Sequence, residues 1–291
     1  MNRTALVTGA TQGLGFALAE GLAARLEPGD TVYLTGRSSE RLADAMSAVA
    51  AGPAEIRTEL LDVGDAGSVN HVASEIARRH GGVDILFSNA YHRVQPGDDP
   101  AIVVSEYVNV NNLGTTRVLR AFAPLLRDGG RLIVVASTMG TLHYLAPVLH
   151  GYFSDACSLD DLDRVVCGWR DAVRDGSALA GAWPAFINIP SKVAQVAALR
   201  SLARERRSDD ERRGIFLAAV CPGMIDTAAS RAWYDMSRAQ TPAQAACAPL
   251  GLVLDPASRP ELYGELVRFG ERLPWSASEP AALGPTGRSS R

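Results

Sequence analysis

The chain has 291 residues, a formal net charge of −3 at pH 7, 47% hydrophobic residues and 21% charged residues. These values describe an ordinary globular protein with a sizeable core, and the mixed charges exclude a basic surface for nucleic acid or an anionic membrane. No apolar run reaches the ~20 residues that a membrane span needs, and the N-terminus leads directly into an apolar strand pattern without a signal peptide. We therefore expect a cytoplasmic protein that binds a small molecule.

The cysteines give no sign of a metal site or a disulfide framework. They show neither a Cys-x-x-Cys pair nor the spacing of metal ligands. In a cytoplasmic protein we expect them to be reduced, and we expect no bound metal. The four cysteines are Cys157, Cys167, Cys221 and Cys247.

Apolar runs alternate with segments of helical periodicity, which is typical of β-α-β units and a parallel sheet. The expected strands are Ala5–Thr8, Thr31–Thr35, Ile56–Leu61, Ile85–Ser88, Arg131–Ala136 and Ile215–Val220. The expected helices are Gly13–Leu26, Glu40–Val49, Gly67–Arg79, Leu113–Leu126 and Ser191–Arg206. We predict one α/β domain over residues 1–275, built on a single Rossmann-type, doubly wound parallel sheet of about seven strands. Residues 276–291, rich in Ser, Pro, Gly and Ala, are expected to form a disordered tail.

The segment between Ser137 and Lys192 is too long for a simple strand-to-helix connection. Ser158, with an acid three residues later, predicts a capped helix start, and Gly176 predicts the helix end. The apolar positions between them share one helical face. These positions are Leu162, Val165, Val166, Trp169 and Val173. We therefore expect a helical insertion at about residues 145–182, over the substrate side.

A glycine-rich segment follows the first expected strand and opens the first expected helix. It reads Thr8-Gly9-Ala10-Thr11-Gln12-Gly13-Leu14-Gly15. The free N–H groups of a helix N-terminus bind a pyrophosphate, and glycines let the backbone approach it closely. We predict a dinucleotide cofactor that contacts Gly9, Thr11, Gln12, Gly13, Leu14 and Gly15.

Arg37 stands just after the second expected strand, and no acidic residue stands at that strand end. An acid would accept the ribose 2′-hydroxyl of NAD, whereas a cation pairs with a 2′-phosphate, so the predicted cofactor is NADP(H). A solvated arginine at a helix start is the alternative. Asp62 and Val63, after the third expected strand, would meet the adenine, although Asp62 could equally cap a helix.

These motifs and others downstream resemble the short-chain dehydrogenase/reductase family, and in particular its monomeric carbonyl-reductase branch. The pair Trp183-Pro184 and the long insertion point to that branch, and the resemblance runs to about Trp275. In that branch the insertion covers a surface that other members use to oligomerise, so the resemblance implies a monomer. It rests on the glycine-rich segment, Asp62-Val63, Asn89-Ala90, Asn111-Asn112-Leu113-Gly114, Ser137, Ser191-Lys192 and the run from Cys221 to Thr227.

The resemblance implies a role for each matching residue. Asn111 would sit at a helix irregularity and hold a water in a proton relay, and Ser137 would hydrogen-bond the substrate carbonyl oxygen. Lys192 would hold the nicotinamide ribose and lower the pKa of a neighbouring tyrosine. The cofactor would also contact Asn89, Ala90, Pro222, Gly223, Ile225 and Thr227.

One position departs from the family pattern, because Asn188 stands where the family places a proton-donating tyrosine. On a helix it would share a face with Lys192, four residues later. An amide donates a hydrogen bond but has no proton to transfer at neutral pH, and losing a general acid costs about 10²–10⁴-fold in rate. The candidate substitutes are Tyr91, which replaces a family glycine near the cofactor ribose, and His143 and Tyr144, which follow Ser137 in the chain. Further candidates are His92, His150 and Tyr152.

Three functions remain open on the sequence. The favoured one is an NADPH-dependent reductase of a bulky or aromatic ketone, because the rest of the machinery is intact. The second is an NADP(H)-binding enzyme with a non-redox reaction, a cyclisation, epimerisation or dehydration, in which Ser137 and Asn188 form an oxyanion-type pair. The third is a non-catalytic protein that senses or binds the cofactor.

Overall fold

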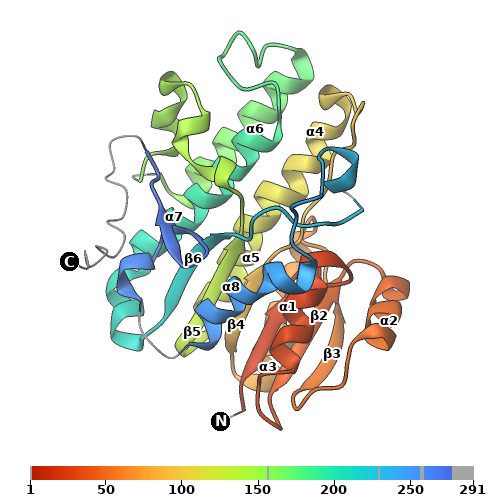
Figure 1. The fold of residues 1–291 in the computed structure, drawn as a ribbon. Coiled ribbons are helices and arrows are strands. Elements are labelled where there is room, and N and C mark those ends of the chain that lie inside the picture. The colour runs from red at the N-terminus through yellow and green to blue at the C-terminus, as the bar shows by residue number, and fades with distance from the viewer. Residues whose placement is uncertain (1, 156, 229, 256–258, 277–291) are drawn as a thin grey trace, which may run out of the picture.

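A computed structural model describes residues 2–276 except 156, 229 and 256–258, so the expected tail lies outside the described residues apart from Ser276. Eight strands form one sheet in the order β3-β2-β1-β4-β5-β6-β7-β8 (Figure 1). Neighbouring strands are parallel except β7 and β8, which pair antiparallel. The strands are β1 (Thr4–Val7), β2 (Thr31–Gly36), β3 (Glu55–Leu60), β4 (Val83–Ser88), β5 (Leu126–Val135), β6 (Phe216–Cys221), β7 (Leu266–Arg268) and β8 (Glu271–Leu273).

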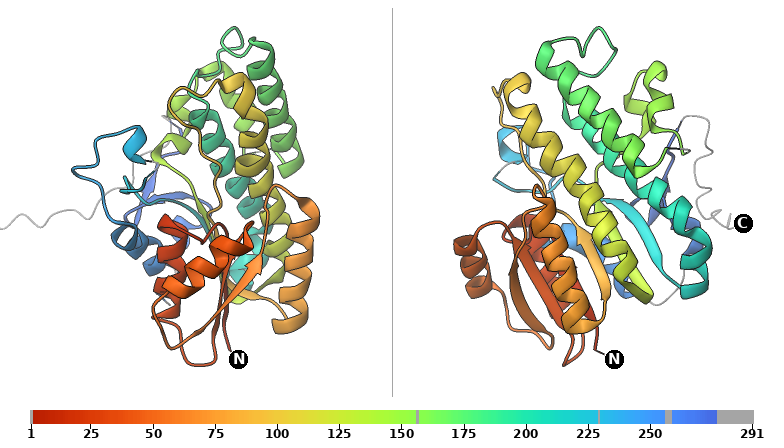
Figure 2. Two further views of the ribbon diagram at one scale, coloured as in Figure 1. Left: turned by 90° about the vertical axis from the view of Figure 1, so that its right-hand side faces the viewer. Right: turned by 180° about the vertical axis from the view of Figure 1, so that it is seen from behind.

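Helices cover both faces of the sheet, which confirms the doubly wound α/β class (Figure 2). Helices α1 and α8 pack against each other on one face, and α3, α5 and α7 lie on the other. Helix α4 runs into α5 through one π-helical turn, Asn109–Leu113. The helices are α1 (Gly13–Ala23), α2 (Ser39–Ala48), α3 (Ala66–His80), α4 (Pro100–Val108), α5 (Gly114–Phe122), α6 (Leu159–Asp175), α7 (Asn188–Arg213) and α8 (Pro242–Leu254).

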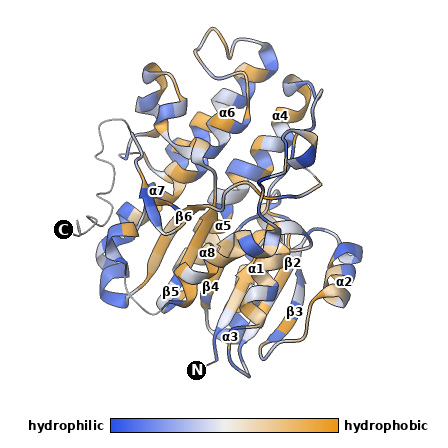
Figure 3. Cartoon of the chain, in the orientation of Figure 1, coloured by the Kyte–Doolittle hydropathy of each residue, from blue (hydrophilic) through white to orange (hydrophobic). Residues whose placement is uncertain are grey.

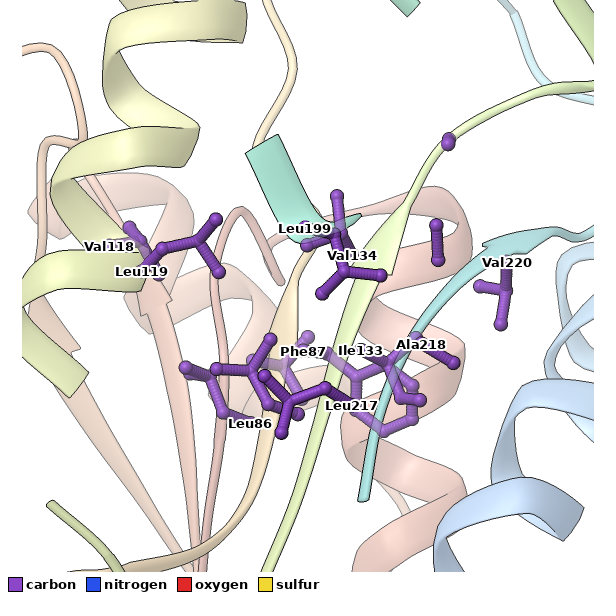
Figure 4. Close-up of a cluster of buried hydrophobic side chains, with 14 of the residues drawn as sticks. Leu86, Phe87, Val118, Leu119, Ile133, Val134, Leu199, Leu217, Ala218 and Val220 are labelled. Atoms are coloured by element: carbon purple, nitrogen blue, oxygen red, sulfur yellow. The ribbon is translucent and has the colours of Figure 1, made fainter. Parts of the chain in front are cut away.

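The core lies between the central strands and the helices on either side. Strands β1, β2 and β6 are buried along their whole length, as expected for strands covered on both faces. Strands β4, β5 and β6 are mostly hydrophobic in Figure 3, and Figure 4 shows side chains of these strands packed beside α5 and α7. The edge strand β3 has no fully buried residue. The side chains labelled in Figure 4 are Leu86, Phe87, Val118, Leu119, Ile133, Val134, Leu199, Leu217, Ala218 and Val220.

Six strands and five helices lie where the sequence predicts them, with shifted ends. The helix expected to reach residue 126 ends at Phe122, since Pro124 interrupts it and Leu126 already belongs to β5. Helix α7 starts three residues early, at Asn188, and continues to a left-handed Gly214. Its last turns carry the ion pair Arg206–Asp210, whose carboxylate is buried, and the exposed ion pair Arg212–Asp209, which support the helix beyond the apolar pattern.

Helices α4 and α8 and the hairpin β7–β8 were not predicted. Both helices nevertheless carry readable start signals. The Asp99 side chain caps α4, which has a proline in its first turn, and Thr241 and Gln244 form a capping box on α8. The hairpin strands have three residues each, which is too short for a period-two pattern.

The expected insertion contains helix α6. Its capping box pairs Ser158 with Asp161, and it ends at a left-handed Gly176, as predicted. Its buried face packs against α4 and α7. The insertion therefore lies against the outer side of the helical layer.

The described residues contain neither a membrane-spanning helix nor a metal-binding group of side chains. None of their helices is long and apolar enough to cross a bilayer. No three His, Cys, Asp or Glu side chains gather among them into a metal-binding group. The four cysteines are free thiols.

Candidate active site

A cavity of about 900 Å³ lies at the carboxyl ends of the parallel strands. The sheet order reverses between β1 and β4, and ligands of open α/β sheets bind at such a crevice. Each of the first six strands is followed by a residue that lines this cavity. These residues are Gly9, Arg37, Asp62, Asn89, Ser137 and Pro222.

The glycine-rich segment packs directly on the residues that follow β4. Gly9 has φ +62°, and a Cβ there would lie 2.7 Å from Ala90 Cα. A Cβ at Gly15 would lie 2.4 Å from both Gly9 O and Asn89 Nδ2. No side chain fits at either position, so these glycines hold the loop close to the sheet.

The N-terminus of α1 is open to the cavity. Gln12 precedes the helix in an extended conformation, and no side chain caps the first turn. The N–H groups of that turn are therefore available to an anion, and the closely packed glycines form the cradle that a pyrophosphate requires. Gln12, Thr11 and Leu14 line the cavity, whereas Gly13 supports the turn from outside the lining.

Basic side chains gather at the end of the cavity next to β2. Arg37 is 61% exposed, and its Nη1 lies 3.5 Å from Glu106 Oε1. Arg41 and Ser38 line the same end. Ser38 is the residue that caps α2, and Arg37 pairs with the exposed Glu106 at the rim of the cavity.

Asp62 and Asn89 shape the loops that line the cavity. Asp62 Oδ1 accepts a hydrogen bond from Gly64 N at 2.8 Å, and the residue that caps α3 is Asp65, so the helix-cap alternative for Asp62 is wrong. Asn89 Nδ2 donates to Thr8 O at 2.9 Å and to Gly9 O at 3.1 Å. Both residues line the cavity, with Val63 and Ala90 beside them.

Asn188, the first residue of α7, is held by two phenols. Tyr91 and Tyr107 each place their hydroxyl 2.8 Å from Asn188 Oδ1, and the two hydroxyl oxygens are 2.9 Å apart. Burial raises the pKa of Tyr91 to about 12 and that of Tyr107 well above its ordinary value, so both stay protonated. The amide oxygen is thereby occupied, which leaves the amide N–H groups of Asn188 for a ligand in the cavity.

Lys192 is the sole lysine of the chain and is almost fully buried. Its Nζ donates to Gln195 Oε1 at 2.9 Å and lies 4.5 Å from the centroid of the Tyr91 ring. Burial lowers its pKa to about 8. The lysine therefore stands on the cavity wall beside Tyr91 with no carboxylate partner among the described residues.

Asn111 lies in the π-helical turn, in agreement with the expected helix irregularity. It is fully buried and does not line the cavity. Its carbonyl oxygen accepts from Gln195 Nε2 at 2.9 Å and from Thr115 Oγ1 at 2.7 Å. Two protein donors therefore occupy the backbone oxygen of Asn111. Its side-chain amide instead bonds the backbone N and O of His92, at 2.7 and 3.0 Å.

Ser137 follows β5 and faces the cavity. Its Oγ accepts from Met139 N at 3.3 Å, so its own hydrogen remains available to donate. His143 and Tyr144 do not line the cavity, and Tyr144 is exposed. Just before them, Leu142 N donates to Trp275 O at 2.9 Å. Of the substitutes considered for the missing acid, Tyr91 and His92 line the cavity.

Several residues that line the cavity, or that bond to its lining, escaped the sequence reasoning. Phe186 and Trp233 pack with ring centroids 5.9 Å apart and form an aromatic wall with Tyr234. Gln195 was recognisable in principle, because it lies three residues after Lys192 on one helical face. Tyr107 was not, since the π-helical turn that follows it shifts the helical register. The expected cofactor contacts Pro222, Gly223, Ile225 and Thr227 all line the cavity.

Comparison with known proteins places this site in a family context. A sequence profile described as short chain dehydrogenase matches residues 3–151. Carbonyl reductase (NADPH) 1 of Mus musculus is 28% identical over 282 residues, which cover 93% of this chain and 98% of that protein. Carbonyl reductase (NADPH) 3 of Mus musculus is 29% identical over 276 residues, covering 92% and 96%. The similarity thus extends over nearly the whole of both chains.

Solved structures share the fold. Menthone neomenthol reductase from Mentha piperita superposes with a TM-score of 0.73 at 24% identity, covering 93% of this chain and all of that chain. The NADPH-bound carbonyl reductase from chicken fatty liver gives a TM-score of 0.67 at 20% identity, covering 94% and 99%. At these identities the likeness concerns the arrangement of the strands and helices.

Proposed function

Because this chain belongs to the short-chain dehydrogenase family, we propose that it is an NADP(H)-dependent oxidoreductase that reduces a bulky or aromatic ketone. The single observation that carries this proposal is one cavity that joins the glycine-rich segment to Ser137, Asn188 and Lys192. The names of the full-length relatives, which are NADPH carbonyl reductases, support the same cofactor and reaction class.

The chain provides a place for each part of NADP(H). The open first turn of α1 would bind the pyrophosphate, and Arg37, with Ser38 and Arg41, would bind the 2′-phosphate. Lys192 would hold the ribose next to the nicotinamide, and the segment after β6 would line the nicotinamide ring. When bound, NADPH supplies a hydride.

Two hydrogen-bond donors would hold the substrate carbonyl. Ser137 offers its hydroxyl and Asn188 offers its amide N–H groups, and both line the cavity. Such a pair stabilises the negative charge that develops on the oxygen as the carbonyl carbon is reduced. The rings of Phe186 and Trp233 form an apolar wall that suits a bulky or aromatic ketone.

Tyr91 would supply the proton that completes the alcohol. Its pKa of about 12 is below that of the alcohol that forms, so proton transfer from the phenol to the alkoxide is favourable. Tyr107 would donate a hydrogen bond to the resulting phenolate, and the Lys192 ammonium beside the ring would stabilise the negative charge. Because Tyr91 lines the cavity, water entering after product release would return the proton.

A second function rests on the same two hydrogen bonds to Asn188. In the resting site both phenols point at the amide oxygen, so Ser137 and Asn188 form an oxyanion-type pair without a free acid beside it. Such a pair would serve a cyclisation, epimerisation or dehydration, with NADP(H) bound but not consumed. The two functions differ in whether the cofactor turns over.

The test follows NADPH absorbance with a panel of aromatic ketones and quantifies the alcohol that forms. Under the first function, NADPH is consumed in equal amount to the alcohol, and Ser137→Ala abolishes both. Product formation without NADPH consumption would establish the second function instead. Asn188→Tyr sharpens the result, because ketone reduction that rises by orders of magnitude shows that Asn188 serves some other reaction.

We also propose that the chain acts as a monomer with one catalytic domain over residues 1–275. Helix α6 packs on α4 and α7, so it occupies the outer side of the helical layer where a second subunit would otherwise dock. Light scattering of the full chain, with and without NADPH, tests this proposal. A mass of twice 30.8 kDa or more would contradict it.

A further inference from the structure

The segment that follows β4 is held at almost every residue. The hydroxyl of Tyr91 bonds Asn188, and both backbone groups of His92 bond the Asn111 side chain. The next anchor comes from the far side of the cavity, where Trp233 Nε1 donates to Val94 O at 3.2 Å. The backbone on both sides of Arg93 is therefore fixed before any ligand binds.

Arg93 is the one strongly basic side chain on this segment, and it lines the cavity. It is half-buried, and no carboxylate among the described residues pairs with it. A partly buried guanidinium usually has an anionic partner, because its loss of hydration is otherwise uncompensated. An anionic ligand in the cavity would supply such a partner.

The charges of the cavity are divided between its two ends. The carboxylates in the lining are Glu40 and Asp62, which follow β2 and β3 at the nucleotide end. The part of the lining after β4, β5 and β6 contains Arg93 and Lys192 and no carboxylate among the described residues. Once Lys192 is engaged by the cofactor, Arg93 remains as the cation that faces the substrate.

The surroundings of Arg93 limit the kind of anion. The Trp233 indole, bonded to the backbone oxygen of the neighbouring Val94, also packs on Phe186, so an aromatic wall and Arg93 line the same cavity. A flat apolar body would lie against these rings while its charged end meets Arg93. The planar guanidinium matches a carboxylate, which it binds through two parallel hydrogen bonds.

We propose that Arg93 binds the carboxylate of the substrate, so that the natural substrate is an aryl ketone that also carries a carboxylic acid. This inference rests on the proposed function, since it names the substrate class of the same site. Ser137 and Asn188 would hold the ketone oxygen, and Arg93 would hold the acid at the other end of the molecule.

The experiment compares two probes that differ in charge, 3-benzoylpropionate and its methyl ester. Isothermal titration calorimetry measures the affinity of each for the full chain, with and without saturating NADP⁺. We expect the acid to bind about ten- to a hundredfold more tightly than the ester, as a charge-assisted hydrogen bond would give. Raising the salt concentration should weaken the binding of the acid and leave the binding of the ester unchanged.

Three variants separate recognition from folding. Arg93→Gln should remove the preference for the acid, and Arg93→Lys should keep part of it because it retains the charge. Arg238→Gln is the matched control, since Arg238 is exposed and lies outside the cavity lining. All three should keep the thermal melting temperature and the NADPH affinity of the wild type.

Equal affinity of the wild type for acid and ester, including no binding of either, would overturn the inference. So would an Arg93→Gln variant that still prefers the acid. Failure of NADPH to bind is a separate result, because it contradicts the proposed function and leaves the titrations without cofactor readable.

Discussion

The two ends of the cavity are built in different ways. At the nucleotide end, consecutive residues present backbone N–H groups, and glycines stand where an added Cβ would lie only 2.7 Å or less from neighbouring atoms. The substrate end is built from four segments that are far apart in the chain. Each segment contributes one of the side chains Tyr91, Tyr107, Asn188 and Trp233. One end depends on local backbone geometry, the other on long-range packing.

This difference explains how the site accommodates Asn188 in place of the expected tyrosine. The residue begins helix α7 and directs its amide oxygen to two hydroxyl groups, so this oxygen and both phenols are hydrogen-bonded. Side chains that meet from separate segments can exchange roles in this way. A backbone cradle has no comparable freedom, because a Cβ at Gly9 or Gly15 has no room.

The largest expected effect comes from Tyr91→Phe, which tests whether the substrate end still delivers a proton. The variant should lower kcat for ketone reduction by about 10²–10⁴-fold, as for a lost general acid. NADPH affinity, measured by fluorescence titration, should change little because the nucleotide end is untouched. A variant that retains wild-type kcat would show that the proton comes from elsewhere.

Lys192→Met tests the one buried cation that the two ends share. Burial lowers the pKa of Lys192 from 10.5 to about 8, so between these values the unfolded chain binds one more proton than the native chain. Native stability should therefore rise by about 3 kcal/mol as the pH passes from below 8 to above 10.5.

In the Lys192→Met variant this contribution to the pH dependence should disappear. At pH 7 the variant should be more stable than the wild type by up to about 3 kcal/mol, because the cost of burying the charge is gone. Urea unfolding of both proteins at pH 7 and pH 10 measures the difference. A variant less stable than the wild type at pH 7 would contradict this interpretation.

Gly9→Ala tests the backbone cradle alone. The left-handed backbone and the contact with Ala90 should cost about 1–3 kcal/mol of unfolding free energy and weaken NADPH binding. Gly168→Ala is the matched control, because Gly168 lies exposed on α6 with no atom near its added Cβ, and it should gain about 0.5–1 kcal/mol. Thermal melting measures the stability of both variants. Equal shifts of the two melting temperatures would show that Gly9 has no special role.

Tyr107→Phe has the smallest expected effect and separates support from chemistry. The variant loses one buried hydroxyl but leaves Asn188 bonded to Tyr91, so the cost should be about 1 kcal/mol of stability. Its kcat should fall by no more than about tenfold. A loss of kcat as large as that of Tyr91→Phe would instead show that the two phenols act as one unit.

The sequence predicted those parts of the site whose chemistry is carried by neighbours along the chain. The loop from Gly9 to Gly15 was recognisable because spacing alone defines a glycine cradle before a helix. The candidates His143 and Tyr144 were placed near the site by their distance from Ser137 in the chain, and neither lines the cavity in the structure, where Leu142 just before them bonds Trp275. Sequence distance was a poor guide there because the insertion redirects the backbone.

The sequence by itself determined the alternating strands and helices, the nucleotide cradle and the absence of a tyrosine at position 188, because each is a property of local spacing or residue type. Only the tertiary structure decided that Tyr91 and Tyr107 meet at Asn188, that Gln195 joins Lys192 to Asn111, and that Arg93 is left facing the cavity. These contacts join residues far apart in the chain, and their geometry depends on how the whole sheet and its helices pack.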